Sequence, residues 1–285
     1  MIIKINSFLG VQYSLNHKVT HPAQTHNSNN YKVNHYHGLP IFSKDFVHLF
    51  FQNLTTIFIM FQSFIDLIFP RICAGCQKPL QHKEEVICTD CRFELPFTNS
   101  HLQVDEKLDK RFLGKVKLER SLAYLKFVKG GKVQRMMHEL KYKGNIQVGE
   151  LLGRMYGSEL KENGFSEKFD LILPVPLHAN RLIIRGYNQS DSLAKGLSES
   201  LQVEWRNDIL KRGISTESQI NKSRLERYEN MKDVFFVDNL EGLSEKRIVI
   251  VDDTLTTGAT LESCVLALND VGVKNVSIIA FAATY

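Results

Sequence analysis

The chain has 285 residues, of which 43% are hydrophobic and 24% are charged, values close to the average of globular proteins. This composition excludes a collagen-like, fibrous or wholly disordered protein, and the length allows one or two domains. The net charge of +5 is a mild basic excess that is compatible with phosphate-bearing partners. Five cysteines are too few for a disulfide-dense secreted protein.

The first segment, residues 1–45, shows neither the apolar period of a helix nor that of a strand. Five of the ten histidines lie in it, without the regular spacing of a metal site. A transit peptide would carry arginine, and the first arginine of the chain is Arg71. We expect residues 1–45 to be a disordered or non-native N-terminal extension, with Met60 as a candidate start of translation.

Residues 46–70 are the most apolar stretch of the chain. Their apolar residues recur at the i, i+3/i+4 spacing of an amphipathic helix, and Pro70 ends the pattern. Polar residues interrupt the stretch, and an aspartate such as Asp66 costs about 2.5–3.5 kcal/mol at the centre of a membrane. We expect a helix packed on protein, and a membrane anchor or signal segment is the alternative that is not favoured.

A four-cysteine module follows in residues 71–100, where two C-x2-C pairs are separated by eleven residues. The cysteines are Cys73, Cys76, Cys88 and Cys91. Four thiolates around one ion form the usual closed structural site of Zn²⁺, so we expect a small zinc ribbon. Two disulfides would require an oxidising compartment, for which the sequence gives no convincing signal, and an iron–sulfur cluster is less usual at this spacing. The fifth cysteine, Cys264, lies on the apolar stripe of a predicted helix and is expected to be an inert core thiol.

From Ser121 onward, strand patterns alternate with helix patterns, which predicts a parallel sheet flanked by helices. The predicted strands cover 121–128, 171–176, 248–251 and 276–283. The predicted helices carry apolar stripes over 133–140, 151–155, 193–201 and 261–268.

The strongest functional pattern is IVIVDDTLTTGAT at 248–260, where a buried strand leads to Asp252 and Asp253. The loop that follows opens into a helix, whose free N–H groups and positive dipole end suit a phosphate. Hydroxyl groups of the threonines add donors, and Gly258 lets the backbone approach the ligand closely. The carboxylates would repel a phosphate and should face sugar hydroxyls or the waters around a divalent metal. A 5-phosphorylated ribose satisfies both halves of the pattern, whereas a merely capped helix is the structural alternative.

The stretch VDDTLTTGAT resembles the ribose-phosphate loop of type I phosphoribosyltransferases, which bind 5-phosphoribosyl 1-pyrophosphate (PRPP). More narrowly, the chain resembles the ComF family of competence-associated proteins from about residue 61 to residue 285. The supporting stretches are ELKYKGN, LPVPLHANRLIIRGYNQS and QINKSRLERYENMKDVF, together with the four-cysteine module. The implied fold is a type I phosphoribosyltransferase-like domain over 115–285, preceded by the zinc ribbon.

The resemblance also implies roles for particular residues. Asp252 and Asp253 would hold the ribose hydroxyls as the catalytic pair, and a pyrophosphate loop would follow an earlier strand, with Mg²⁺ bound alongside PRPP. Thr254, an unusual residue after the acidic pair, lies beside the predicted 5-phosphate loop. That phosphate-binding set is Thr254, Thr256, Thr257, Gly258, Ala259 and Thr260, and the pyrophosphate loop is Pro174, Val175, Pro176, Leu177 and His178.

Further cations are expected around the same site. Arg181, Arg185 and Asn188 are placed to neutralise phosphate oxygens, although for each residue alone a solvated side chain is the favoured alternative. The polar stretch 213–233 matches the flexible hood that closes over the reacting centre of phosphoribosyltransferases. In it, Arg224 and Arg227 are three residues apart and would clamp pyrophosphate from one helix face, with a solvated helix as the alternative.

A basic stretch between residues 105 and 143 holds twelve lysines and arginines against five acids. Such a stretch could track a nucleic-acid backbone, with Tyr124, Phe127 and Tyr142 stacking on bases. The alternative is a solvated helix face with core aromatics. The family resemblance implies single-stranded DNA and competence proteins as partners during natural transformation.

Two functional hypotheses follow. The first is a cytoplasmic PRPP-binding protein with a structural zinc ribbon that handles single-stranded DNA during competence. The second is an active phosphoribosyltransferase that transfers phosphoribosyl from PRPP to a nitrogen base or amine and releases pyrophosphate.

Overall fold

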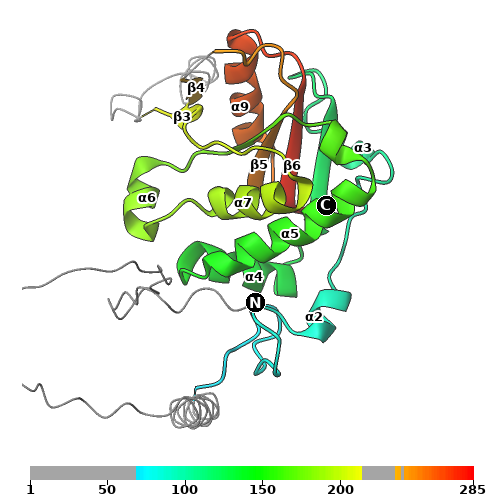
Figure 1. The fold of residues 1–285 in the computed structure, drawn as a ribbon, viewed down its shortest axis with the longest axis vertical. Helices are drawn as coiled ribbons and strands as arrows, with labels where there is room; N and C mark the ends of the chain where they lie inside the picture. Colours follow the sequence, from blue (N-terminus) through cyan, green and yellow to red (C-terminus); the bar gives the residue numbers. More distant parts are fainter. Residues whose placement is uncertain (1–68, 214–234, 239–240) are drawn as a thin grey trace, which may run out of the picture. The chain divides into compact units, whose positions relative to one another are not determined.

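The computed structural model of the chain describes residues 69–213, 235–238 and 241–285, and Figure 1 shows their arrangement. All of them belong to one compact unit, Ile59–Tyr285. The extension predicted over 1–45 and nearly all of the helix predicted over 46–70 lie outside the described residues. Within the described ranges, no helix is long and apolar enough to cross a membrane.

The centre of this unit is a sheet of four strands in the order β1-β6-β5-β2, and all neighbours run parallel. This arrangement confirms the predicted α/β class, because parallel neighbours require crossover connections that helices supply. The strands are β1 (Arg120–Lys126), β2 (Leu171–Pro174), β5 (Ile248–Leu255) and β6 (Val276–Ala283).

Four helices of eleven or more residues flank the sheet: α4 (Lys132–Tyr142), α5 (Ile146–Glu162), α7 (Gln189–Leu201) and α9 (Ala259–Asp270). Each contains one of the predicted apolar stripes. The sequence patterns did not predict several short elements. These are α2 (Thr89–Phe93), α3 (Glu106–Asp109), the 3-10 turn η1 (Phe165–Glu167), α6 (Ala179–Arg185), and the antiparallel pair β3 (Leu210–Arg212) and β4 (Phe235–Val237).

The two faces of the sheet bury different side chains, because successive strand residues point to opposite sides. On β5, Val249 and Val251 join the core beneath α4, α5 and α7. Ile248 and Ile250 join a second core with the apolar stripe of α9. A sheet that is covered on both faces explains why its strands appear in the sequence as continuous apolar runs.

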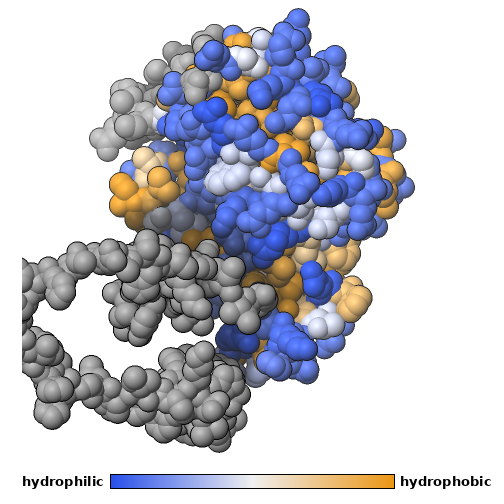
Figure 2. Space-filling model, viewed as in Figure 1, coloured by the Kyte–Doolittle hydropathy of each residue, from blue (hydrophilic) through white to orange (hydrophobic). Residues whose placement is uncertain are grey.

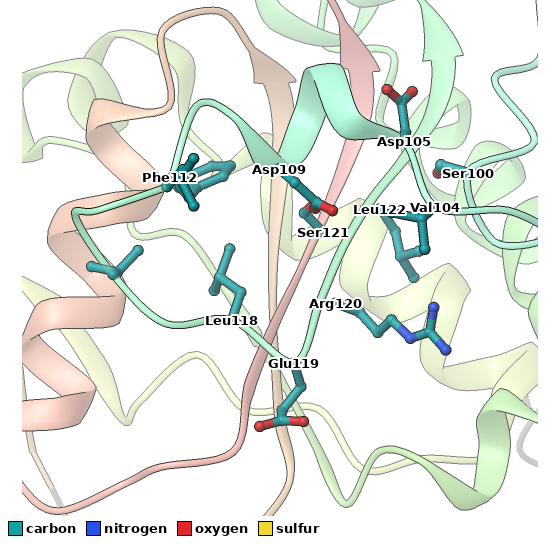
Figure 3. Close-up of a pocket in the computed structure, with 12 residues that line it drawn as sticks. Ser100, Val104, Asp105, Asp109, Phe112, Leu118, Glu119, Arg120, Ser121 and Leu122 are labelled. Atoms are coloured by element: carbon teal, nitrogen blue, oxygen red, sulfur yellow. The ribbon is translucent and has the colours of Figure 1, made fainter.

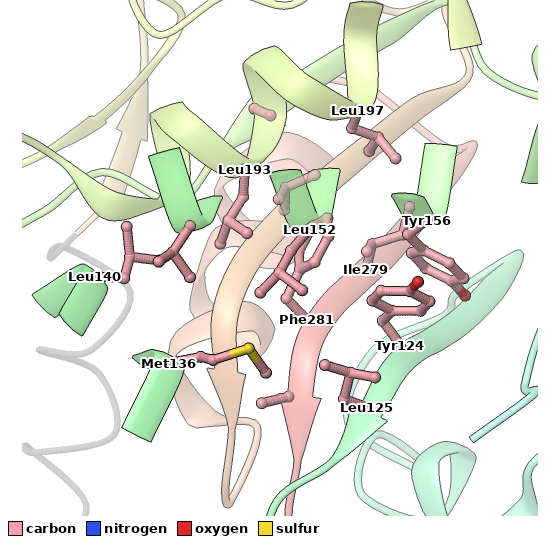
Figure 4. Close-up of a cluster of buried hydrophobic side chains, with 14 of the residues drawn as sticks. Tyr124, Leu125, Met136, Leu140, Leu152, Tyr156, Leu193, Leu197, Ile279 and Phe281 are labelled. Carbon is pink, nitrogen blue, oxygen red and sulfur yellow. The ribbon is translucent and has the colours of Figure 1, made fainter. Parts of the chain in front are cut away.

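An aromatic cluster fills the core between the sheet and α5 (Figure 4). The rings of Tyr124 and Tyr156 stack with their centroids 4.4 Å apart, and Phe281 meets both rings edge-on. Tyr124 is 1% exposed and donates its hydroxyl hydrogen to Glu159 Oε1 at 3.0 Å. Tyr124 therefore cannot stack on a nucleic-acid base, and of the two alternatives left open by the sequence it is a core aromatic residue.

Helices α5 and α7 pack with their backbones unusually close together. A Cβ atom at Gly153 would lie 2.4 Å from the carbonyl oxygen of Leu193, and one at Gly196 would lie 2.2 Å from that of Glu150. Glycine at both positions is therefore a packing requirement of this helix pair.

The four-cysteine module is attached to the edge strand of the sheet. Phe97 forms a β-bridge with Leu125, and Thr98 N donates to Tyr124 O at 3.0 Å. Arg135 of α4 donates from Nε to the carbonyl oxygen of Gly75 at 2.6 Å. The module and the sheet are thus joined both at β1 and at α4.

Strand β5 continues four residues beyond the predicted end at Val251. Its pairing with β6 extends through Thr254 and Leu255, which align with Ala282 and Ala283. The aspartates interrupt the apolar run that marks the strand in the sequence, although the backbone ladder continues past them. The acidic pair therefore lies inside the strand.

Candidate functional site

The four cysteines of the module converge on one point. Their sulfur atoms all lie within 4.8 Å of one another, and no disulfide joins them. Cys73 Sγ accepts hydrogen bonds from the backbone N–H groups of Cys88, at 3.2 Å, and Gly75, at 3.4 Å. Burial acts to raise the pKa of Cys73, but the backbone N–H groups of Cys76, Cys88 and Gly75 bring it down to about 7. The cluster has the donors and compactness of a structural Zn²⁺ site, as predicted.

Two further residues bear on this centre. A Cβ atom at Gly75 would lie 3.0 Å from Cys91 Sγ, so glycine gives the knuckle room to close. Cys264, the remaining cysteine, lies on the buried face of α9, and burial raises its pKa well above the usual value. Its thiol is therefore held in the protonated, unreactive form.

The acidic pair presents its two carboxyl groups to different surroundings. Asp253 is 4% exposed, and its Oδ1 lies 2.7 Å from the ammonium nitrogen of Lys141, which comes from the last turn of α4. Lys141 Nζ also donates to Thr254 Oγ1 at 3.2 Å. Asp252 Oδ1 accepts a hydrogen bond from Asp253 N at 2.8 Å and from Ser190 Oγ at 3.4 Å.

These surroundings perturb Asp252 strongly. Burial, and then the adjacent carboxylate of Asp253, raise the pKa of Asp252 to about 7. Lys141 and Ser190 oppose this rise without cancelling it. Two neighbouring acids, one paired with an ammonium and one whose pKa is shifted toward neutrality, are typical of functional sites.

The predicted phosphate loop connects β5 to the N-terminus of α9. Gly258 is the N-cap residue of α9 with φ of 89°, a left-handed conformation that favours glycine. Thr256 and Thr257 are exposed, and Thr257 Oγ1 accepts from Ala259 N at 3.4 Å. The loop therefore leads into the N-terminus of a twelve-residue helix. The first N–H groups of this helix lie at the positive end of its dipole, which favours an anion.

The segment between the zinc module and β1 contacts the loop that joins β5 to α9. The Arg111 guanidinium donates to the carbonyl oxygens of Leu255, Thr256 and Thr284. The Phe112 ring packs on Gly258, where a Cβ atom would lie 3.1 Å from it. Phe112 also lies in the wall of a cavity against β1, whose volume is about 230 Å³. Figure 3 shows this cavity and its lining residues. Sequence reasoning missed these contacts, because no local pattern relates Arg111 to a loop far along the chain.

The middle of the predicted pyrophosphate loop and its two end residues lie in different surroundings. Pro174 is the last residue of β2 and is buried, and His178 caps α6 by accepting from Asn180 N at 3.2 Å. Val175, Pro176 and Leu177 line a cavity that they share with the acidic pair. The structure thus brings the middle of this loop, and not its two ends, to the wall of that cavity.

We call this shared space the site cavity; its volume is about 280 Å³. Thr254, Thr256 and Thr260 line it, whereas Thr257, Gly258 and Ala259 are not among its lining residues. The cations in its wall are Lys141, Arg181, Arg185 and Arg212, and the two aspartates line the same cavity. The site cavity therefore presents cationic and acidic groups to one ligand.

Arg212 is a site residue to which the sequence assigned no role. It ends β3, its guanidinium lies 5.1 Å from the centre of the Phe235 ring, and its buried Nε has no hydrogen-bond partner among the described residues. Burial lowers the pKa of Arg212, and the nearby Arg181 also acts to lower it. No pattern in the sequence around Arg212 indicates this position, because the β3–β4 pair was not predicted.

The other predicted cations differ in their surroundings. Arg185 Nη1 donates to Gln189 Oε1 at 2.7 Å, and its guanidinium lies 5.2 Å from the centre of the Tyr142 ring. Asn188 instead caps α7 and donates from Nδ2 to Val175 O at 3.0 Å, so its side chain fixes the backbone rather than facing the ligand. Arg224 and Arg227, predicted for the hood, lie outside the described residues.

Much of the basic stretch is engaged in contacts within the protein. Lys115 pairs with Glu262, Lys132 with Glu94 and Lys141 with Asp253. Lys117, Lys126 and Lys129 are exposed, and Tyr142 is 66% exposed. Phe127 is half-buried against the core. Of the three aromatic residues predicted to stack on bases, Tyr142 has the most accessible ring.

Helix α6 carries apolar residues outward beside the site cavity. Ile183 and Ile184 are 81% and 82% exposed, and no residue of α6 is buried. Figure 2 shows this apolar patch at the left of the view, where Figure 1 places α6.

Comparisons with families of known proteins agree with both parts of the structure. The phosphoribosyl transferase domain family matches residues 189–284, which include the acidic pair and the loop. The double zinc ribbon domain family matches residues 64–102, which include the four cysteines.

Individual proteins are also similar to this chain. Competence protein F of Haemophilus influenzae is 27% identical over 215 residues, which cover 73% of this chain and 88% of that protein. DNA utilization protein YhgH of Escherichia coli strain K12 is 28% identical over 194 residues, which cover 67% of this chain and 80% of that protein. Among solved structures, a purine phosphoribosyltransferase from Pyrococcus horikoshii aligns with 57% of this chain and 78% of its own, at 21% identity and a TM-score of 0.29.

Proposed function

Because this chain belongs to the ComF family of competence-associated proteins, we propose that it binds PRPP or a related 5-phosphoribosyl ligand and handles single-stranded DNA during natural transformation. The observation that carries the ligand assignment is the pairing of Asp252 and Asp253 with a phosphate-type loop in one cavity. The 5-phosphate would lie at the N-terminus of α9, and the sugar hydroxyls would face the acidic pair. The zinc ribbon has a structural role in this proposal.

The expected ligand contacts follow from the charges around the site cavity. Arg181, Arg185 and Arg212 would neutralise the pyrophosphate of PRPP, which carries the greatest negative charge of the ligand. Mg²⁺, when bound, would neutralise pyrophosphate oxygens further. Arg224 and Arg227 remain the proposed hood residues that would close over the ligand.

Handling of DNA is supported by the names of two relatives, competence protein F and DNA utilization protein YhgH. In this chain the exposed Lys117, Lys126 and Lys129 would contact the phosphate backbone, and the accessible ring of Tyr142 would stack on a base. These events would take place in the cytoplasm, where free thiols and a zinc ribbon are stable.

An active phosphoribosyltransferase is the second candidate, because three arginines converge where pyrophosphate would leave. Calorimetry with PRPP and Mg²⁺ on the wild type and Asp252→Asn, with pyrophosphate assayed in the same samples, separates the two. Binding that Asp252→Asn abolishes, without pyrophosphate release on addition of bases or amines, is the expected result. Release that depends on an added acceptor would favour the transferase.

The DNA part of the proposal is tested by titrating single-stranded DNA at several salt concentrations. Each neutralised phosphate contributes about −0.7 to the slope of log K against log salt for single strands. Three contacts from the exposed lysines predict a slope of about −2, and replacement of all three by glutamine should bring it close to zero. A wild-type slope near zero would contradict contacts between the lysines of the basic stretch and DNA phosphates.

A further inference from the structure

Lys141 occupies the place beside the acidic pair where a metal ion would be expected. Its ammonium lies 2.7 Å from Asp253 Oδ1 and 3.2 Å from Thr254 Oγ1. The side chains of Lys141 and Asp253 are 22% and 6% exposed, so water screens their attraction only weakly. The ammonium is therefore a fixed positive charge at the proposed sugar end of the site cavity.

The donor set at Asp253 does not fit a divalent metal. Mg²⁺ demands near-octahedral oxygen ligands at about 2.0–2.1 Å and keeps several waters. One oxygen of Asp253 already faces the ammonium, and the other is buried without a hydrogen-bond partner among the described residues. A divalent ion at this carboxylate would also lie against the positive charge of Lys141, which would repel it.

Lys141 is held in this position by the fold. It lies in the last turn of α4, next to Leu140, whose carbonyl oxygen accepts the hydroxyl hydrogen of Tyr187. In the first turn of α4, Arg135 Nε donates to the carbonyl oxygen of Gly75 in the zinc module at 2.6 Å. Contacts at both ends of α4 therefore fix the helix from which Lys141 reaches the acidic pair.

We propose that Lys141 replaces a divalent metal at the sugar end of the site cavity, so that a ribose 5-phosphate group binds there without a metal ion. An ammonium has three donor hydrogens, and contacts with Asp253 and Thr254 use two of them. The third is available to a sugar hydroxyl oxygen, while the carboxyl group of Asp252 accepts from a hydroxyl hydrogen. This inference rests on the proposed function and names the residue that selects the ligand's sugar.

The test is calorimetric titration with ribose 5-phosphate, which lacks the pyrophosphate that itself binds Mg²⁺. The zinc-loaded full chain is titrated in buffer freed of Mg²⁺ by a resin, since a soluble chelator would attack the zinc module, and then with Mg²⁺ added. The wild-type affinity should change by less than about threefold, a difference smaller than one hydrogen bond contributes.

Variants assign the effect to one side chain. Lys141→Met should weaken binding about tenfold to a hundredfold without Mg²⁺, the range of one charge-assisted hydrogen bond, and added Mg²⁺ should restore part of the loss. Lys141→Arg should retain most of the affinity. Lys143→Met is the matched control, because Lys143 pairs with Glu139 and does not line the site cavity. Zinc content and circular dichroism show whether each variant is folded.

Wild-type binding that requires Mg²⁺, or a Lys141→Met variant that binds as tightly as the wild type, would overturn the inference and leave the proposed function intact. Absence of binding by both ribose 5-phosphate and PRPP, with and without Mg²⁺, would overturn both. If Lys141→Met does not fold, the metal response of the wild type and of Lys141→Arg decides the question.

Discussion

Replacement of Asp252 by asparagine should stabilise the fold at neutral pH, although it removes a proposed ligand group. Burial and the neighbouring Asp253 carboxylate raise the pKa of Asp252 to about 7, from 3.8 in an exposed aspartate. Between these values the folded chain retains a proton that the unfolded chain releases. The free energy of unfolding of the wild type therefore falls, through Asp252, as the pH rises from about 4 to about 7.

The size of the effect follows from the same shift. Each pKa unit corresponds to about 1.36 kcal/mol, so the full difference between 3.8 and about 7 sets an upper limit of about 4 kcal/mol. About 2–3 kcal/mol of this limit develops between pH 5 and pH 8. Asparagine has no charge to bury and keeps an oxygen that can accept the hydrogen bond from Asp253 N, which is 2.8 Å long in the wild type.

Urea unfolding of the zinc-loaded protein at pH 5 and pH 8 measures this difference. The stability of Asp252→Asn relative to the wild type should increase by about 2 kcal/mol between the two values. Asp208→Asn is the control: its pKa is lowered by Arg206, so its contribution changes only in acid and should be flat over this range. An unchanged or reversed difference for Asp252→Asn would refute the placement of Asp252 in a desolvated, acidic environment.

Three other variants test an ion pair, the zinc module and the close packing of α5 on α7. Hydrogen bonds from Arg247 lower the pKa of Asp170 to about 2. Asp170→Asn should therefore lower the free energy of unfolding by about 1 kcal/mol at pH 7, a value reduced for the partial exposure of the pair. Below about pH 2, acid-unfolding curves should show no difference from the wild type. Cys91→Ser should release zinc, seen by a colorimetric metal assay, and lower the melting temperature; full zinc retention would contradict the four-thiolate site. Gly153→Ala should cost about 1–3 kcal/mol in urea unfolding, because its Cβ would lie 2.4 Å from a backbone oxygen of α7; a neutral result would contradict the close helix pair.

The sequence predicted the sheet and its long helices because strands buried on both faces are continuous apolar runs and helices buried on one face carry an apolar stripe. Residues such as Val249 and Ile250 are apolar on both faces of a covered strand, and the stripe of α9 follows a single helical face. The predicted end of β5 at Val251 was wrong, because backbone pairing with β6 continues through Asp252 to Leu255, where the side chains are no longer all apolar. The backbone hydrogen bonds of a strand can extend beyond its apolar residues.

The site was partly predictable for a related reason. Asp252, Asp253 and their loop are adjacent in the sequence, so one motif contains them. Lys141 is more than a hundred residues away from Asp253, and only the packing of α4 against the sheet brings them together. The sequence could not decide whether Tyr124 stacks on bases or packs in the core, since an aromatic residue on a strand reveals neither which face it occupies nor whether that face is covered.

A structure of the chain with bound ribose 5-phosphate tests the central claim most directly. We predict the phosphate at the N-terminus of α9, within hydrogen-bond distance of the backbone N–H groups around Gly258. It also predicts the sugar hydroxyls at Asp252 and at the Lys141–Asp253 pair. A ligand bound elsewhere, or one whose phosphate faces the aspartates, would contradict it.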